Sequence, residues 1–251
     1  MNNNQLLHRT VQTEENTNYA GAAELWANEA NLPRYNVNIV RKLSQYDPPQ
    51  NARVLEFGAG IGSLAKLWAK EKGIKPICIE IDPKLKVIIE SRGFECFSSL
   101  ENVNGQFDLI YSSNVLEHIE DDQNTLGHLY QKLKPGGVLA LYLPAFNCLY
   151  SDFDAAIGHY RRYEMQELIS KLKNVNFAIE LCEYADSIGF FAWLITKSKK
   201  SDPSTRINNH AKLRLYDCYI LPISNFLDKF GMKYVFGKNL LAIAKKPIDK
   251  V

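Results

Sequence analysis

The sequence predicts an α/β fold in which a doubly wound, mostly parallel sheet of seven strands is flanked by helices. From residue 53 onward, short apolar runs alternate with helix-length segments, a pattern typical of parallel β-α-β units. A glycine-rich turn at residues 58–62 joins an apolar run to a helical pattern. The 251 residues, 46% of them hydrophobic, suffice for one such domain and a smaller cap.

Residues 1–50 are expected to form a polar tail followed by two helices. Residues 1–18 are rich in Asn, Gln, Thr and Glu, a composition typical of a frayed terminus. Apolar residues recur at helical spacing over residues 20–30 and 35–43. The second helix should end before Asp47-Pro48-Pro49, because a residue preceding proline disfavours the helical conformation.

Residues 51–185 are expected to form the α/β core. The expected strands span residues 53–57, 76–80, 94–97, 107–112, 138–143 and 177–184, and the helices between them span residues 62–71, 83–91, 121–133 and 164–173. Right-handed crossovers place a ligand crevice beyond the carboxyl ends of the strands.

Residues 186–233 are expected to be a helical cap inserted before the last strand. An apolar run at 189–195 is followed by a polar, basic stretch and then by an apolar, helix-like segment over residues 213–230. Residues 234–251 then supply the last strand, at 239–245, and a tail.

The glycine turn predicts a binding site for a small molecule. Gly58 and Gly60 permit positive φ and let a ligand lie against the backbone, while the following helix aims its N-terminus at the same spot. A dinucleotide turn would have a third glycine where this chain has Ser63, and it has no need of the acid Glu56. A turn that serves only packing remains the alternative.

A second carboxylate ends the next predicted strand. Glu80 lies 22 positions after Gly58, where an acid can accept both hydrogens of a ribose diol. Asp82 precedes Pro83 and is expected to cap the next helix. Glu80 therefore predicts a nucleoside ligand without choosing between nucleotide classes.

Two further segments follow in order: Phe107-Asp108-Leu109-Ile110-Tyr111-Ser112-Ser113-Asn114-Val115-Leu116-Glu117-His118-Ile119 and Leu133-Lys134-Pro135-Gly136-Gly137-Val138-Leu139. With the glycine turn and Glu80, they resemble the motifs of class I S-adenosylmethionine-dependent methyltransferases. The resemblance implies a Rossmann-like fold with an antiparallel last strand, and S-adenosyl-L-methionine as cofactor. The implied cofactor-binding residues are Tyr35, Glu56, Gly58, Ala59, Gly60, Glu80, Ile81, Ser99, Leu100, Asn114, Val115 and His118.

Two of these assignments keep an alternative. Relatives often have an aromatic residue of the N-terminal region facing the ligand, which here is Tyr35, although a tyrosine packed on the sheet fits the pattern equally. Relatives often have Asp in the adenine loop, where this chain has Ser99, so backbone groups are the alternative for recognising adenine.

The adjacent Glu117 and His118 have the residue types of a metal site. We expect no metal, because two ligands with no further His or acid nearby make an incomplete site. His118 is instead expected near the methionine end of the cofactor.

A polar and aromatic segment follows the strand at 138–143. It contains Asp154, His159, Arg161 and Arg162 and resembles the Asp-x-x-x-Gly-His-x-Arg-Arg-Tyr segment of a bacterial branch of the family, often associated with glycosyltransferases. We expect His159 to accept a proton from the acceptor or to orient it, and Arg161 or Arg162 to hold an anionic part of it. A structural salt-bridge knot is the alternative.

The predicted function is methyl transfer from S-adenosylmethionine to an oxygen or nitrogen of a small-molecule or glycan-type acceptor. A protein that binds the cofactor without catalysis, in a regulatory or scaffold role, is the alternative from another class. An NAD-dependent oxidoreductase is disfavoured by Ser63, Glu56 and the downstream motifs. The oligomeric state is not predicted.

Composition sets the expected environment. A net charge of +2 gives no reason to expect nucleic-acid binding. Five cysteines without Cys-x-x-Cys spacing are expected to be reduced core thiols of a cytoplasmic protein. The apolar run at 189–195 precedes Lys197, Lys199 and Lys200, so the cap is expected either to pack on the sheet or to touch anionic lipid at the inner membrane surface.

Overall fold

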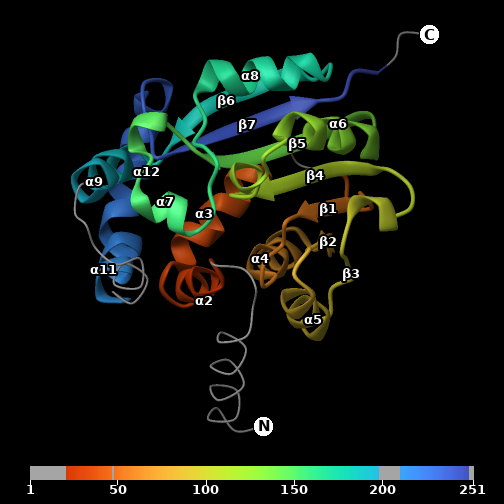
Figure 1. Ribbon diagram of the computed structural model, residues 1–251, viewed down its shortest axis with the longest axis horizontal. Helices are drawn as coiled ribbons and strands as arrows, with labels where there is room; N and C mark the ends of the chain where they lie inside the picture. The colour runs from red at the N-terminus through yellow and green to blue at the C-terminus, as the bar shows by residue number, and fades with distance from the viewer. Residues whose placement is uncertain (1–20, 47, 198–209, 249–251) are drawn as a thin grey trace, which may run out of the picture.

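The computed structural model describes residues 21–46, 48–197 and 210–248 (Figure 1). One seven-stranded sheet with the strand order β3-β2-β1-β4-β5-β7-β6 forms its centre. Leucines of α6 and α8 pack on one face of the sheet, and side chains of α3 and α4, Trp68 among them, pack on the other. This confirms the expected doubly wound α/β architecture.

The strands follow the predicted apolar runs. They are β1 (Val54–Phe57), β2 (Ile77–Ile79), β3 (Cys96–Phe97), β4 (Phe107–Ser113), β5 (Leu133–Pro144), β6 (Ala178–Ala185) and β7 (Asn239–Lys245). The first five pair in parallel. β5 begins before the expected residue 138, because Leu133 already pairs with Phe107 ahead of an irregularity in the register.

The last strand confirms the exception to parallel pairing. β7 runs antiparallel to both β5 and β6 and lies between them in the sheet. The cap precedes β7 in the sequence, so the chain returns from the cap to the sheet between β5 and β6. Because β7 is antiparallel, Lys238, which directly precedes it, lies at the carboxyl ends of β5 and β6.

The helices outside the cap also match their sequence patterns, except for the short helix at residues 152–156, where no helix is predicted. They are α2 (Ala22–Asn31), α3 (Pro33–Leu43), α4 (Ser63–Lys72), α5 (Pro83–Ser91), α6 (Asp122–Lys132), α7 (Asp152–Ala156) and α8 (Met165–Asn174). Asp82 caps α5 as expected: its carboxylate accepts a hydrogen bond from the Lys84 amide at 2.8 Å, and Pro83 occupies the first turn.

The cap is helical, and its segment 210–220 packs against the N-terminal helices (Figure 1). It contains α9 (Ser187–Lys197), α11 (His210–Leu215), a π-helical turn (Tyr216–Ile220), α12 (Leu221–Lys229) and a 3₁₀ turn (Met232–Tyr234). The buried Asp217 carboxylate accepts the backbone amides of Arg34 and Tyr35 at 3.1 and 2.8 Å, so a cap residue supplies the N-terminal cap of α3. The N-terminal helix α3 and the cap, which are far apart in the sequence, are therefore joined directly.

The cysteines only partly follow their prediction. Cys148 and Cys218 are exposed, so the prediction that all five cysteines lie in the core is wrong for these two, although all five are free thiols. The expected tail at 1–18 and the basic residues Lys199 and Lys200 lie outside the described residues. Within the described part of the chain, no helix combines the length and apolar character needed to cross a membrane.

Candidate active site

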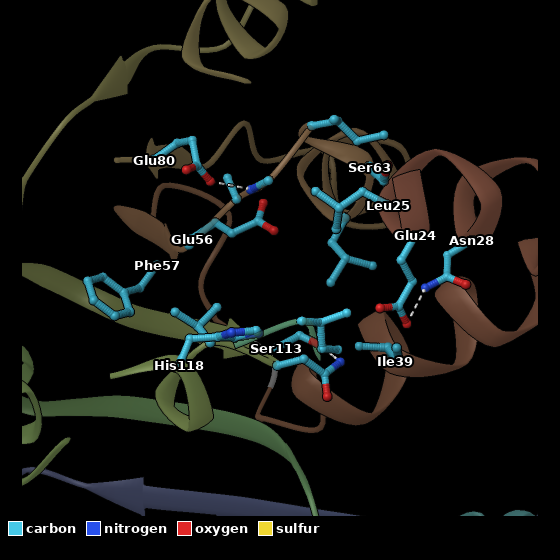
Figure 2. Close-up of a pocket in the computed structure, with 18 of the residues that line it drawn as sticks. Glu24, Leu25, Asn28, Ile39, Glu56, Phe57, Ser63, Glu80, Ser113 and His118 are labelled. Atoms are coloured by element: carbon cyan, nitrogen blue, oxygen red, sulfur yellow. Dashed lines mark hydrogen bonds between the residues drawn. The ribbon is translucent and has the colours of Figure 1, made fainter. Parts of the chain in front are cut away.

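A cavity of about 750 Å³ opens at the carboxyl ends of β1, β2 and β4. The glycine turn and Glu80 form one side of it, the 3₁₀ turn Leu116–His118 lies below, and α2 closes the opposite side (Figure 2). Side chains from the 153–162 segment and the cap complete the lining. All of the expected cofactor residues lie around this one cavity.

The glycine turn has the backbone geometry that its sequence predicts. Gly58 and Gly60 adopt φ values of 77° and 57°, which disfavour any residue with a Cβ. The amides of Gly58 and Ala59 both donate to the Ile79 carbonyl, at 3.0 and 2.9 Å, which ties the turn to β2. A Cβ on Gly58 would lie 2.3 Å from the Val115 side chain, so the close approach requires glycine at this position.

Glu56 is a buried acid that faces the cavity from the end of β1. One oxygen accepts a hydrogen bond from the Tyr111 hydroxyl at 3.0 Å, and the Tyr111 ring stacks on Trp68 with centroids 4.4 Å apart. Burial raises the pKa of Glu56 to about 8, because a carboxylate without water favours its neutral form. A cationic ligand in the cavity would favour the ionised form instead.

Glu80 braces the turn from β2. Its two oxygens accept the amides of Gly60 and Asp82, at 2.7 and 2.9 Å, and the first bond is drawn in Figure 2. Burial raises the pKa of Glu80, and the hydrogen bonds from these amides act against that shift. The neighbouring Ile81 is 84% exposed and borders the cavity, leaving an apolar surface beside the acid.

The remaining cofactor candidates line other parts of the cavity. The hydroxyl of Ser99 donates to the Asn102 side chain at 2.7 Å, and Leu100 is buried beside it. Asn114 has a φ of 53°, and its amide donates to the Tyr142 carbonyl at 2.8 Å. The backbone at Asn114 therefore turns sharply at the end of β4 and directs the following residues, including His118, along the cavity.

Tyr35 satisfies both of the interpretations that its sequence position allowed. It borders the cavity, yet its ring packs edge-to-face on Tyr142, with centroids 6.5 Å apart, and its hydroxyl accepts a hydrogen bond from Asn239 at 3.0 Å. It sits on the part of the wall formed with Lys238 and the cap residue Trp193.

The Asp154–Arg162 segment forms a hydrogen-bonded knot that also faces the cavity. Buried Asp154 contacts His159 Nδ1 at 3.0 Å and accepts from Arg162 Nε at 2.9 Å. Burial alone would raise the pKa of Asp154, but the bond to His159 and the Arg162 charge lower it to about 2. His159 and Arg162 both border the cavity, so the structural and the functional interpretations describe the same cluster.

Arg161 does not join that cluster. Its guanidinium forms an ion pair with Asp122 at 2.9 Å and donates to the Glu120 carbonyl at 2.8 Å, which directs it away from the cavity. Neighbouring side chains of an extended segment point to opposite sides, so Arg162 points inward where Arg161 points outward. The expectation that either arginine could contact the acceptor is therefore wrong for Arg161.

The prediction that no further His or acid lies near Glu117 and His118 is also wrong. His159 is 41 residues further along the sequence than His118, but the ring centroids of the two histidines lie 4.4 Å apart. The candidate ligand atoms of all three side chains lie within 4.8 Å of one another. Sequence spacing alone could not reveal this contact.

Several cavity residues were missed altogether. Glu24 and Asn28 project from α2 and are hydrogen-bonded to each other at 3.4 Å (Figure 2), and Lys238 reaches the cavity from the start of β7. The spacing of Glu24 and Asn28 shows only that they share one face of a helix. No sequence pattern indicates which wall that face meets.

The protein has an α/β fold with a cavity at the carboxyl ends of its parallel strands. A family model described as "Methyltransferase domain" matches residues 29–181, which is more than half of the chain. The chain therefore belongs to the methyltransferase-domain family.

Curated relatives resemble only parts of the chain. It is 32% identical over 132 residues to the mitochondrial ubiquinone biosynthesis O-methyltransferase of Saccharomyces cerevisiae, covering 44% of this chain and 41% of that protein. It is 26% identical over 113 residues to phosphoethanolamine N-methyltransferase 2 of Caenorhabditis elegans, covering 41% and 25%. The chain thus spans well under half the length of these relatives.

Solved structures share the fold across most of the chain. A complex between the Haloferax volcanii Trm112 methyltransferase activator and a putative methyltransferase aligns with a TM-score of 0.63 and 13% identity, covering 92% of this chain and 99% of that one. Haemonchus contortus phosphoethanolamine N-methyltransferase 2 in complex with S-adenosyl-L-methionine aligns with a TM-score of 0.59 and 18% identity, covering 90% and 56%.

Proposed function

We propose that the chain transfers a methyl group from S-adenosylmethionine to an oxygen or nitrogen of a small-molecule or glycan-type acceptor. The observation that carries the proposal is the cavity itself: the glycine turn lies beside two buried acids at one end, and an imidazole with aromatic and basic side chains lies at the other. A cationic nucleoside fits the first end. A polar acceptor fits the second.

The cofactor residues divide by the part of S-adenosylmethionine that each would hold. Glu56 faces the cationic methionine portion, whose charge compensates the buried carboxylate. Glu80 is placed for the ribose diol, and Ser99 with Leu100 for the adenine. Gly58 and Gly60 let the ligand lie against the main chain. The similar solved structure of Haemonchus contortus phosphoethanolamine N-methyltransferase 2 is a complex with S-adenosyl-L-methionine, which supports this cofactor for the present chain.

The chemistry asks little of the protein beyond alignment. A lone pair of the acceptor forms the new bond to the methyl carbon, while the carbon–sulfur bond breaks and its electron pair remains on sulfur. The acceptor's proton passes to a base or to solvent. Because the sulfonium is already reactive, holding acceptor and methyl group in line supplies much of the acceleration.

We place the acceptor against His159, Arg162 and Trp193. Asp154 holds His159 Nδ1, so the imidazole has a defined orientation toward the cavity, which suits a group that positions the acceptor. Arg162 lies over the Trp193 ring with its guanidinium carbon 4.8 Å from the ring centroid. This pairing offers a flat surface for a sugar or another ring. Lys238 adds a positive charge on the same wall.

Binding and turnover together test the proposal. Calorimetry with S-adenosylmethionine measures binding, and release of S-adenosylhomocysteine over a panel of hydroxylated and amine acceptors, including glycans, measures transfer. We expect stoichiometric binding and turnover with at least one acceptor class. Binding without turnover on every class would favour the scaffold alternative, and absence of binding would exclude both.

A second proposal concerns the outer face of the cap. We propose that the protein is cytoplasmic and contacts anionic lipid at the inner membrane surface through α12 and the residues that flank it, Tyr219 and Phe230. Tyr219, Ile223, Phe226 and Phe230 recur three or four residues apart and are all exposed, Phe230 by 75%; such spacing forms one helix face. Of the apolar run in α9, Phe190 packs on Phe146, whereas Phe191 and Ile195 stay exposed.

Co-sedimentation with anionic vesicles at low and high salt tests the membrane contact. We expect binding at low salt that weakens at high salt, and loss of binding when Phe226 and Phe230 are both replaced by Ser. Charge reversal of Lys197, Lys199 and Lys200 should also reduce it. If vesicle binding is unaffected by salt and by both sets of substitutions, or if no binding occurs at low salt, the proposed membrane contact is wrong.

A further inference from the structure

Three side chains that can bind metals meet at the border of the cavity. Glu117 and His118 lie in the 3₁₀ turn after β4, and His159 follows α7. Each side chain offers one nitrogen or oxygen, and these atoms lie within 4.8 Å of one another. The Glu117 Oε1 to His159 Nε2 distance is 3.9 Å. Two of the three residues, His118 and His159, border the cavity.

Glu117 is the group that requires an explanation. Its side chain is completely buried, and neither carboxylate oxygen has a hydrogen-bond partner within residues 21–46, 48–197 and 210–248. Buried polar atoms in folded proteins are nearly always satisfied. The nearby cation, Arg162, is already engaged by Asp154 through both Nε and Nη2, at 2.9 and 2.7 Å. The unpartnered carboxylate thus lies beside the packed pair of imidazoles, with Oε1 3.9 Å from His159 Nε2.

The two imidazoles are oriented as metal-binding histidines usually are. Asp154 holds Nδ1 of His159 at 3.0 Å, which leaves Nε2 on the Glu117 side. The His118 ring donates a hydrogen bond to the backbone carbonyl of Gly158. A ligating histidine typically gives its other ring nitrogen to a carboxylate or a backbone carbonyl, and this contact fixes the ring. Both kinds of support occur here.

The backbone around the cluster is fixed as well. The Tyr160 amide donates to the Glu117 carbonyl at 2.8 Å, and the His159 amide donates to the Asp154 carbonyl at 2.9 Å. The first bond ties the turn that carries Glu117 and His118 to the segment that carries His159, and the second holds His159 against α7. The three side chains therefore approach one another on a rigid frame, which favours a built site over a chance encounter.

We propose that Glu117, His118 and His159 form a binding site for a divalent transition-metal ion. One carboxylate and two imidazoles suit Zn²⁺, Co²⁺, Fe²⁺ or Mn²⁺ better than Mg²⁺, which prefers oxygen ligands. Metal–ligand bonds of about 2.0–2.2 Å require the ligand atoms to close by roughly 1 Å, a shift within the reach of side-chain rotation. Because His118 and His159 border the cavity, an ion held by them would lie beside it.

The consequence for the acceptor rests on the proposed methyl transfer. A metal ion at this place would bind an acceptor oxygen and ease the loss of its proton to solvent, while the methyl carbon approaches from the glycine turn. The site therefore selects a hydroxylated acceptor over an amine. His159 then acts as a ligand that positions the acceptor through the metal and not as the proton acceptor.

Metal binding is measured without reference to activity. Protein freed of metal by a chelator and dialysed is titrated with Co²⁺, whose visible absorption reports its ligands, and Zn²⁺ is added as competitor. Equilibrium dialysis with Zn²⁺ gives the stoichiometry. We expect one tightly bound ion per chain and a rise in the thermal midpoint of the wild-type protein with Zn²⁺ concentration.

Variants decide whether these residues hold the ion. Glu117→Gln and His159→Asn should each weaken Co²⁺ binding at least about tenfold, since even outer contacts of a metal site are worth about 10–100-fold. His128→Asn is the matched control, because His128 is an exposed histidine at the cavity border outside the cluster, and it should leave Co²⁺ affinity unchanged. Thermal unfolding and S-adenosylmethionine affinity confirm that each variant is folded.

Two results would overturn the metal site: no stoichiometric binding of Co²⁺ or Zn²⁺ to the wild-type protein, or equal binding by wild type, Glu117→Gln and His159→Asn. Failure of the methyl-transfer proposal is distinct, because it would show as absent S-adenosylmethionine binding or turnover while metal binding persists. If an amine acceptor is methylated at a rate that neither the chelator nor Glu117→Gln changes, the metal's proposed role is contradicted.

Discussion

The two ends of the cavity are built in different ways. The end proposed for the cofactor, here the cofactor end, is formed by backbone turns and strand ends close together in the sequence, with Gly58, Gly60 and Glu80 within one β-α-β unit. The end proposed for the acceptor, here the acceptor end, gathers side chains from remote segments, such as Glu24 of α2, His159 after α7 and Lys238 before β7. The first end depends on main-chain geometry, which tolerates little change, whereas the second depends on tertiary packing.

The largest effect should come from a side chain placed in the glycine turn. Gly60→Val should abolish S-adenosylmethionine binding measured by calorimetry. A Cβ at this position would lie 3.0 Å from Leu25 and would need the φ of 57° that valine disfavours. The branched side chain would also occupy space in the cavity.

Gly73→Val is the matched control for backbone strain alone. Gly73 caps the end of α4 with a φ of 71°, and apart from its two chain neighbours no heavy atom of the described residues lies within 4 Å of its ideal Cβ. We expect this variant to lose roughly 1–3 kcal/mol of stability and to keep its cofactor affinity. Equal loss of binding in both variants would mean that the turn at Gly60 is only structural.

The next effect separates the two ends. His159→Asn should lower turnover about a hundredfold, as misplacement of a reacting group by about 1 Å does, and leave S-adenosylmethionine affinity unchanged. Arg161→Gln should change turnover little, because Arg161 pairs with Asp122 away from the cavity. If His159→Asn instead loses thermal stability and keeps its turnover, the role of His159 is only structural, within the hydrogen-bonded knot.

Glu80→Ala should have a smaller effect on the cofactor end. Loss of a charge-assisted contact to the ribose should weaken S-adenosylmethionine binding by roughly 1–3 kcal/mol. Because Glu80 also accepts the Gly60 amide at 2.7 Å, part of this loss would come from a looser turn. S-adenosylmethionine and methylthioadenosine, which lacks the amino-acid portion but keeps the ribose, should lose affinity alike. A loss confined to S-adenosylmethionine would move Glu80 away from the ribose.

The difference between the two ends also explains what the sequence could predict. Apolar runs and glycines determine local structure, so the strands, the left-handed turn and the Asp82 cap followed from the residues themselves. The antiparallel direction of β7 followed only from family resemblance, since periodicity carries no strand direction. Packing of Asp217 on the start of α3 depends on residues more than 180 positions apart, and no local pattern encodes it.

The acceptor end shows the same limit at single residues. Arg161 and Arg162 are chemically equivalent in the sequence, and only the direction of the extended segment sends one to Asp122 and the other into the cavity. Glu117 and His118 looked like an incomplete pair until the fold brought His159 beside them. Residue type predicted the chemistry, but tertiary contacts decided which side chains carry it.

The smallest of these effects concerns a single proton on Glu56. Burial raises its pKa from 4.5 to about 8, so the folded protein binds more protons than the unfolded chain between these values. The free energy of unfolding should therefore fall as pH rises through this window. A cation bound beside Glu56 reverses the preference, lowers the pKa and should make S-adenosylmethionine bind more tightly as pH rises from about 5 toward 8.

Proton release on cofactor binding tests the central claim most directly. Calorimetric titration of S-adenosylmethionine at pH 6.5, in buffers of different ionisation enthalpy, counts the protons exchanged. The wild-type protein should bind one cofactor and release up to about one proton, whereas Glu56→Gln should release almost none. Absence of binding, or the same proton release from both proteins, would contradict the placement of the cationic cofactor beside the glycine turn and Glu56.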